Sequence, residues 1–468
     1  MDVVEILLGL SAFSVGLLSL QLWQCVAGRK IRNWLAPSAV LVSLVALCIV
    51  GAKLNAGQPL DILFLELLTE AKPKVILVLL AGVVAGAGLG YAGSVSQHRN
   101  SDFLVSVVIG GVALQLTATG LLLAWDEVFD LVRFKAEVTD QAFRLEEFAR
   151  TEQNPIRLAI DPNADSLYFS CYETRFNGNY SGSIFRVPLS GKGLRNPSLA
   201  ASSPVLHRPF GLACYNGDIF VSRAGHAAAV YQGRIEYASM GAVTQLKDLD
   251  HNGEFELYGD VVTGLPAARG PDTMHQNNGI AFDSEGNLFV AVGSSDDRSL
   301  DEHPWAGKIL RCPKEGRESA VFASGLRNPF GLCCIGNNTL LVTDNDCSED
   351  PGDEVNFVFE GGHYGHPYTL PRQKRVTGFD DAVIVGNKSN YCGIAAMDSE
   401  IETVAYVCDR LGDRVLKLTL KISGNKCTLA DEQVFARIPA PIDVVVGDAG
   451  EMYVASISKK IIYKISPR

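Results

Sequence analysis

The stretch NGIAFDSEGNLFVAVGS, residues 278–294, decides the fold because it is one copy of a pattern that recurs along the chain. It reads as an apolar strand, a polar turn and a second apolar strand. Five other stretches share this cadence: IRLAIDPNADSLYFSCY (156–172), PFGLACYNGDIFVSRAG (209–225), PFGLCCIGNNTLLVTDN (329–345), GIAAMDSEIETVAYVCD (393–409) and PIDVVVGDAGEMYVASI (441–457). Self-similarity at a period of roughly 50 to 70 residues predicts a repeat architecture.

Further strand-like runs flank these copies. Most copies are followed by a run such as GSIFRVPL (182–189), and several are preceded by one such as AVFASGL (320–326). Four short strands per unit are typical of a β-propeller blade, so six units predict a six-bladed β-propeller over residues 141–468. We expect the last strand to complete the first blade, because this pairing closes the ring and removes its free edges.

The first quarter of the chain has a different composition. Residues 3–27, 35–52, 75–95 and 103–125 are apolar stretches of spanning length with charges almost only at their ends. The sequence therefore predicts membrane α-helices followed by an all-β domain: four transmembrane helices in 1–127, a linker at 128–140 and the propeller. A cleaved signal peptide is the alternative for the first stretch, but that stretch has no basic leading region and more spans follow it.

The orientation in the membrane follows from the charges in the loops. Arg29, Lys30, Arg32 and Arg99 favour cytoplasmic first and third loops, whereas lysines at 53, 72 and 74 nearly balance them in the second. An even number of spans then predicts the propeller on the periplasmic or extracellular side.

Charge and cysteine content narrow the function classes. The net charge of −11, without a basic tail or patch, argues against nucleic acid as a partner. Nine cysteines fall within the predicted propeller, an odd number that leaves at least one thiol even if disulfides form. There is no CxxC pair to indicate a zinc site or a redox motif.

Three polar islands interrupt the strand pattern and are the candidates for chemistry. They are MHQNNG at 274–279, LRNP at 326–329 and GDEVNFVFEGGHYGHPY at 352–368. Each places a histidine, an Arg-Asn pair or clustered carboxylates beside a strand. Loops on a rigid scaffold are where binding and catalytic residues concentrate, so we expect these islands to line one pocket.

At these islands the sequence resembles the six-bladed quinoprotein glucose/sorbosone dehydrogenase family, over about residues 141–468. The segments that carry the resemblance are RPFGLACYNGDIFVS, MHQNNGIAF, ASGLRNPFGL and DEVNFVFEGGHYGHPY. Members use pyrroloquinoline quinone (PQQ) held by Ca²⁺ to oxidise a sugar hydroxyl or an aldehyde. The resemblance implies PQQ and Ca²⁺ as cofactors, a sugar, polyol or aldehyde substrate, and membrane lipid and a membrane quinone as further partners.

The resemblance also implies roles for individual residues. His275 matches the general base, and Arg327 and Asn328 match the catalytic pair that contacts the quinone. Arg208 and Arg410 are the further cofactor-binding candidates. The metal candidates are Glu354 and Tyr364 at a structural calcium, and Ser348 and Glu349 as carbonyl ligands of the cofactor calcium.

One departure from the family keeps an alternative open. Where the family carries an arginine pair that grips the cofactor carboxylates, this chain has Ala-Pro-Ile-Asp at 440–443, with only Arg437 nearby. The alternative function is a non-catalytic propeller that binds carbohydrate or protein on its upper face. A lactonase-type hydrolase is a third hypothesis, although no set of carboxylate and asparagine ligands for one catalytic Ca²⁺ can be named.

Two further groups of polar residues have weaker interpretations. DLDHNGEFE at 248–256 resembles the start of an EF-hand loop, but its twelfth position is Gly259 and not the bidentate glutamate, so a surface turn explains it as well. His303, His363 and His366 have no metal-ligating neighbours in sequence and are interpreted as structural.

Overall fold

A computed structural model describes residues 135–468, apart from residues 162, 175–179, 192, 232–233, 238, 268–274, 276, 297–299, 302, 315–317, 337, 346–351, 369–377, 387–388 and 399–401. The four predicted membrane spans lie outside the described residues. Among the residues that are described, no helix is long and apolar enough to cross a membrane.

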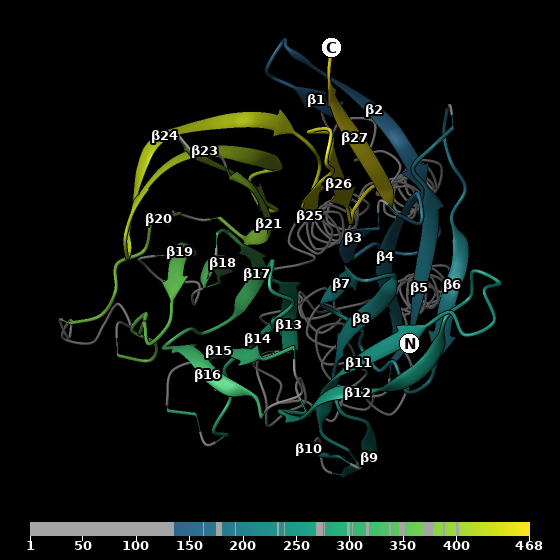
Figure 1. The fold of residues 1–468 in the computed structure, drawn as a ribbon, viewed down its shortest axis with the longest axis vertical. Coiled ribbons are helices and arrows are strands. Elements are labelled where there is room, and N and C mark those ends of the chain that lie inside the picture. The colour runs from purple at the N-terminus through teal and green to yellow at the C-terminus, as the bar shows by residue number, and fades with distance from the viewer. Residues whose placement is uncertain are drawn as a thin grey trace, which may run out of the picture. The chain divides into compact units, whose positions relative to one another are not determined.

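Five four-stranded antiparallel sheets and one five-stranded antiparallel sheet form the ring, which confirms the six-bladed β-propeller (Figure 1). The first three blades follow the chain from its inner to its outer strand. Blade 1 contains β3 (Arg157–Asp161), β4 (Ser166–Thr174), β5 (Tyr180–Pro188) and β6 (Ser198–Ser203). Blade 2 contains β7 (Leu212–Tyr215), β8 (Asp218–Arg223), β11 (Gly241–Lys247) and β12 (Glu256–Leu265). Blade 3 contains β13 (Asn277–Phe282), β14 (Leu288–Val292), β15 (Lys308–Cys312) and β16 (Ala320–Ser324).

The remaining blades complete the ring. Blade 4 contains β17 (Pro329–Cys334), β18 (Thr339–Asp344), β19 (Glu354–Phe359) and β20 (Ile384–Val385). Blade 5 contains β21 (Tyr391–Asp398), β22 (Thr403–Asp409), β23 (Arg414–Ser423) and β24 (Lys426–Arg437). Blade 6 contains β25 (Pro441–Val446), β26 (Met452–Ser456), β27 (Ile461–Pro467) and, as its outer strand, β2 (Phe143–Arg150).

The closing blade corrects one prediction. The last strand does not complete the first blade; β2, from the start of the domain, completes the last blade by pairing antiparallel with β27, with Phe143 opposite Pro467. A two-residue strand, β1 (Glu137–Val138), lies before the predicted start of the propeller at 141 and adds a fifth strand to blade 5. Short strands of this length carry too little sequence pattern to be recognised.

Burial explains why the sequence forms these strands. All residues of β14 (LFVAV) and of β26 (MYVAS) are buried, because the second strand of a blade is covered by both neighbouring blades. The outer strand β12 is exposed at eight of its ten positions. The core therefore lies between blades, in a series of apolar clusters around the ring.

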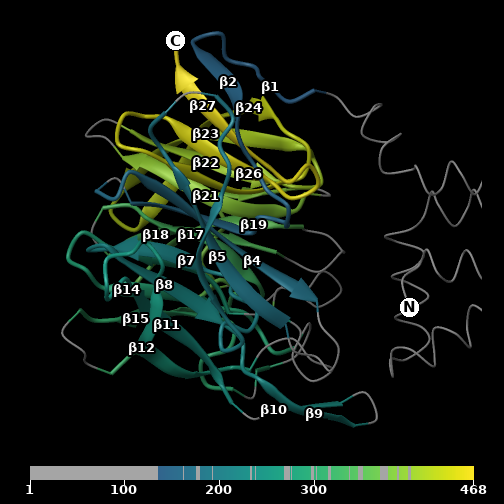
Figure 2. The same cartoon turned by 90° about the vertical axis from the view of Figure 1, so that its right-hand side faces the viewer.

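Each ring surface has its own set of loops. We call the entry end the surface where each first strand begins and each second strand ends, as at Asn277 and Val292 of blade 3. Between β8 and β11, on this end, a separate hairpin is formed by β9 (Ala227–Tyr231) and β10 (Arg234–Tyr237). Figure 2 shows that this hairpin projects from the ring.

The six inner strands surround the centre of the ring (Figure 1). Charged and aromatic side chains meet there. Arg157 of β3 forms an ion pair with Asp443 of β25, with 3.1 Å between Nη1 and Oδ1, and their side chains are only 5% and 8% exposed. The guanidinium also donates to the carbonyl of Phe330 and lies over the rings of Phe330 and Phe210, 4.3 and 5.1 Å from the centroids. Residues of four blades are thus joined through one arginine.

Candidate active site at the entry end

His275 and Arg327 are joined through one serine. The backbone N–H of His275 donates to the carbonyl of Ser294 at 3.2 Å, and the N–H of Ser294 donates to the carbonyl of Arg327 at 2.7 Å. Ser294 follows β14, whereas His275 precedes β13 and Arg327 precedes β17. The structure therefore brings the first two polar islands together at the entry end, as their positions before first strands predict.

The Arg327–Asn328 pair is fixed by a buried acid. Asp344, at the end of β18, accepts the backbone N–H of Arg327 at 2.9 Å and that of Asn328 at 2.6 Å. Arg327 is 8% exposed, and its guanidinium donates to the carbonyl of Asn345 at 2.6 Å. Because one carboxylate accepts both N–H groups, it fixes the backbone of the two residues that precede β17.

A row of amides connects this pair to the third island. Asn278 donates to Asn328 (Nδ2 to Oδ1, 2.8 Å), and Asn328 donates to Asn345 (Nδ2 to Oδ1, 3.2 Å). Asn345 donates in turn to Oδ2 of the buried Asp353 at 2.8 Å. Side chains from blades 3 and 4 thus share one hydrogen-bonded row.

Sequence reasoning missed Ser294 and gave His366 a purely structural interpretation. His366 is 9% exposed, and its Nε2 lies 3.2 Å from Oγ of the fully buried Ser294. Ser294 Oγ also donates to Oδ1 of Asp301 at 2.9 Å. Residues 361–366 run back along β16, which brings His366 to the entry end. In the sequence, only the motif GGHYGHPY marks His366 as part of a candidate site. The motif does not reveal that residues 361–366 return along β16 to the entry end.

The two other candidate cofactor arginines also lie at the entry end. Arg208 precedes β7, is 8% exposed and adopts the left-handed backbone region with a φ of 47°. Arg410 is exposed directly after β22, and its N–H donates to the carbonyl of Asn390 at 2.9 Å. The described residues thus place arginines of blades 2, 4 and 5 at the entry end, where Arg410 is exposed and Arg208 and Arg327 are buried.

The predicted metal ligands are only partly described. Ser348 and Glu349 lie outside the described residues. Glu354 begins β19 and accepts a bond from Asn356 Nδ2 at 3.2 Å, while the buried Tyr364 donates its hydroxyl to the carbonyl of Phe357 at 2.7 Å. In the described part of the chain, no group of three or more His, Cys, Asp or Glu side chains is placed to hold a metal ion.

The loop at 248–254 uses its carboxylates internally. The carboxylate of Asp248 accepts the backbone N–H groups of Asn252 and Gly253 at 3.0 and 2.9 Å. The side-chain oxygen of Asn252 accepts the backbone N–H of Glu254 at 2.6 Å. His251 and Gly253 have φ values of 59° and 85°. These are the contacts of a polar surface turn.

At the position of the missing arginine pair, the structure places a carboxylate. Asp443 is buried in β25, where burial raises its pKa and Arg157 opposes this rise. Arg437 lies on the outer strand β24 and is 4.0 Å from Glu137 of β1, so it belongs to the outer rim of blade 5. Among the residues that the structure describes, the entry to blade 6 therefore offers no arginine clamp to a ligand.

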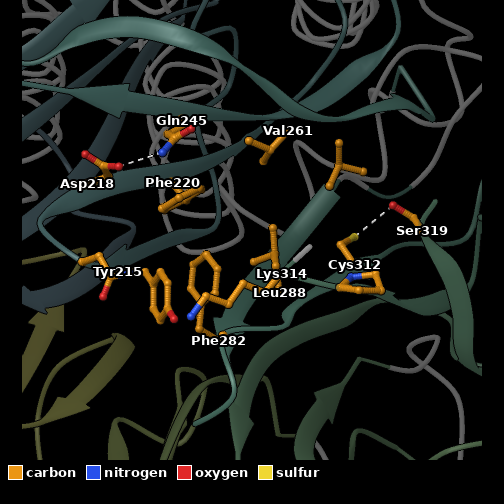
Figure 3. A pocket seen from close by; sticks show the side chains of 14 residues that line it. Tyr215, Asp218, Phe220, Gln245, Val261, Phe282, Leu288, Cys312, Lys314 and Ser319 are labelled. Atoms are coloured by element: carbon orange, nitrogen blue, oxygen red, sulfur yellow. Dashed lines mark hydrogen bonds between the residues drawn. The ribbon is translucent and has the colours of Figure 1, made fainter. Parts of the chain in front are cut away.

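A cavity of about 440 Å³ lies at the opposite end, between blades 2 and 3 (Figure 3). Its wall includes Tyr215, whose ring stacks on that of Phe282 with 4.4 Å between the centroids. It also includes Gln245, whose Nε2 donates to Oδ2 of Asp218 at 2.7 Å. Cys312 lies 3.1 Å from Ser319 Oγ across the cavity wall. None of the predicted site residues that the structure describes lines this cavity.

Comparisons with known proteins agree with the resemblance. Residues 216–374 match the family described as Glucose / Sorbosone dehydrogenase. The aldose sugar dehydrogenase YliI of Escherichia coli (strain K12) is 29% identical over 109 residues, which span 20% of this chain and 29% of that relative.

Solved structures share the fold. The PQQ-bound aldose sugar dehydrogenase of Streptomyces coelicolor is 19% identical, with a TM-score of 0.52 over 71% of this chain and 98% of that one. The apo-form of the soluble aldose sugar dehydrogenase of Escherichia coli is 20% identical, with a TM-score of 0.51 over 70% and 100%. The resemblance seen in the sequence is confirmed: residues 216–374 carry the signature of the glucose/sorbosone dehydrogenase family, on the six-bladed fold of solved sugar dehydrogenases.

Proposed function

We propose that this chain is a membrane-anchored, PQQ-dependent sugar or aldose dehydrogenase that passes electrons to a quinone acceptor. The observation that supports the proposal is the backbone link from His275 through Ser294 to Arg327, by which these two residues lie at one end of the ring. A base beside a cation suits a reaction in which a hydroxyl loses its proton while negative charge develops nearby.

The charges at the entry end fit a planar polyanion such as PQQ. Arg208, Arg327 and Arg410 supply guanidinium groups from three blades, and such groups bind carboxylates through paired hydrogen bonds. The carboxylate of Asp443 is paired with Arg157 and adds little net negative charge at the centre. Arg208, Arg327, Asn328 and Arg410 would hold the cofactor, and Ser348, Glu349, Glu354 and Tyr364 are the residues proposed for Ca²⁺. When bound, PQQ supplies a two-electron acceptor for the hydride of the substrate.

The residues of this chain supply the proton transfer and the orientation. Oxidation of a sugar hydroxyl releases one hydride and one proton, and His275 is the side chain proposed to accept that proton. An imidazole suits this role because its ordinary pKa lies near neutrality. Arg327 and Asn328 are proposed to orient the cofactor, since Asp344 and Asn345 fix both their backbone and their side chains.

The membrane anchor and the location complete the proposal. Four apolar stretches before residue 127 support an anchor that holds the propeller on the periplasmic or extracellular side, near membrane lipid and quinone. Protease added to intact spheroplasts should then remove the propeller. Cleavage only after the membrane is breached would invert the orientation.

The decisive experiment is a titration of the full chain in detergent with PQQ and Ca²⁺, followed by thermal unfolding and by turnover with D-glucose and an artificial electron acceptor. We expect His275→Ala to abolish turnover and retain PQQ binding, because only a proton acceptor is removed. Arg327→Lys should weaken both, because a point charge replaces a planar fork. Equal loss of binding in the two variants would indicate a structural role for His275.

A non-catalytic propeller that binds carbohydrate or protein at the entry end is the second candidate. The observation that favours it is the Arg157–Asp443 ion pair at the place where the family has its arginine clamp. A wild-type chain that shows no thermal shift with PQQ and Ca²⁺, but a shift with a sugar alone, would select this candidate.

A further inference from the structure

The amide row at the entry end begins at an acid. Asp353 is 6% exposed, and its Oδ2 accepts both the backbone N–H of Tyr391 and Nδ2 of Asn345, each at 2.8 Å. The same Nδ2 donates to the carbonyl of Tyr391 at 2.6 Å. An ionised carboxylate and a carbonyl accept hydrogen bonds but cannot donate them. The nitrogen of Asn345 is therefore the end that faces Asp353.

This orientation passes along the row. With its nitrogen turned to Asp353, Asn345 presents Oδ1 to Asn328, so Asn328 must supply Nδ2 at the 3.2 Å contact. Asn328 then presents Oδ1 to Asn278, which supplies Nδ2 at 2.8 Å. Reversing any one amide would bring two oxygens or two N–H groups together, which leaves buried groups unsatisfied.

The far end of the row is Asn278. Asn278 is fully buried, and within the described part of the chain its Oδ1 is a buried acceptor that receives no hydrogen bond. Asn328 itself is half-buried. It can therefore offer its remaining N–H and its remaining lone pair to a ligand in one arrangement only.

We propose that Asp353 is a positioning residue of the candidate site, which sets the direction of the Asn328 amide through Asn345. The inference rests on the proposed function and adds a residue to it. Asp353 does not contact the ligand in this role. Its carboxylate decides which end of Asn328 carries the donor, and hence the orientation in which a cofactor or sugar oxygen is bound.

The test compares Asp353→Ala with a matched control in the full chain. Asp283 is also 6% exposed and also accepts backbone N–H groups and an asparagine side chain, from Glu285 and Asn287, but it closes a turn at the opposite end of the ring. Both variants should lower the unfolding temperature. Only Asp353→Ala should weaken PQQ binding in the presence of Ca²⁺, by about 10- to 100-fold, the range typical of lost supporting contacts.

A double-mutant cycle separates positioning from general destabilisation. In an Asn328→Ala background, Asp353→Ala should have little further effect on PQQ affinity, because the amide that it orients is gone. Asp353→Asn keeps one acceptor oxygen and should recover part of the affinity. Additive losses in the cycle, or an equal loss in Asp283→Ala, would overturn the proposal.

The same cycle measured on thermal unfolding without ligand distinguishes the two proposals. If the wild-type chain binds no PQQ, the proposed function fails; if it binds no sugar either, Asp353 has no ligand-positioning role. Coupling between Asp353 and Asn328 in unfolding would then show the row itself to be present, and its absence would refute the row as well.

Discussion

Blades 4 and 6 begin with the same topology and use an aspartate in different ways. In blade 4, Asp344 ends the second strand and its carboxylate holds the two residues that precede β17. In blade 6, Asp443 lies inside the first strand and its carboxylate reaches Arg157 of blade 1. A shift of the acid by one strand therefore changes its role, from holding a loop that can face a ligand to joining blades at the centre.

The largest effect is expected at the central ion pair. Arg157→Ala should lower the free energy of unfolding by about 3–5 kcal/mol, because it leaves the carboxylate of Asp443 buried without its partner. Urea unfolding of the full chain measures this. The double replacement Arg157→Met with Asp443→Leu should recover most of the loss. A change below about 1 kcal/mol in Arg157→Ala would break the comparison, since the pair would then contribute no more than a surface pair.

A smaller effect is expected at the acid of blade 4. Asp344→Ala should cost about 1–3 kcal/mol, because the N–H groups of Arg327 and Asn328 lose their acceptor. Unlike Arg157→Ala, Asp344→Ala should also weaken PQQ binding, because the backbone of Arg327 is no longer held in place. Asp344→Asn, which keeps one acceptor oxygen, is the control. Unchanged binding in both variants would show that the loop needs no such support.

The thiol of Cys392, in blade 5 beside the central pair, predicts an alkaline effect. Cys392 is 1% exposed, and burial raises its pKa from 9.0 to about 12. The unfolded thiol loses its proton near pH 9 while the folded thiol keeps it, so its contribution is complete below pH 9 and falls as the pH rises towards 12. Cys392→Ala should therefore flatten the decline of stability above pH 9 by up to about 1.4 kcal/mol per pH unit. An identical slope in the variant would contradict this assignment.

The smallest effect is expected at Arg437, the only arginine near the entry to blade 6 in sequence. It is 51% exposed and 4.0 Å from Glu137, so Arg437→Ala should cost less than about 1 kcal/mol. PQQ affinity should stay at the wild-type value, because this side chain belongs to the outer rim. A marked loss of affinity would mean that blade 6 does hold the cofactor.

The repeats were sufficient to predict the ring, because each blade has its own copy of the strand–turn–strand pattern. The strand that closes the ring was misassigned, since β2 and β27 are far apart in sequence and neither carries a signal for its partner. β1 was missed because two residues carry no periodicity. The eight cysteines among the described residues are free thiols. The sequence could not decide this state, because the odd number of nine cysteines in the predicted propeller requires only that at least one is a thiol.

The sequence likewise predicted only some of the residues of the candidate site. Positions before first strands were enough to predict that His275, Arg327 and Asn328 lie at one end. Ser294, His366 and Asp353 were missed because their roles depend on contacts between separate segments, such as the return of residues 361–366 along β16. The inward turn of Asp443 depends on Arg157, 286 residues earlier, which no local pattern reveals.

The closure of the ring also sets the timing of folding during synthesis. β2 leaves the ribosome early, but the strand that covers it comes last, and the bond from Arg144 to Ser466 joins residues 322 positions apart. At typical rates of translation, roughly 15 to 65 s pass before that partner exists. During this interval the nascent domain has an open strand edge on each side of the gap, and such edges invite pairing with other chains. A chaperone that shields strand edges would act in this interval, before the last seven-residue strand, β27, arrives.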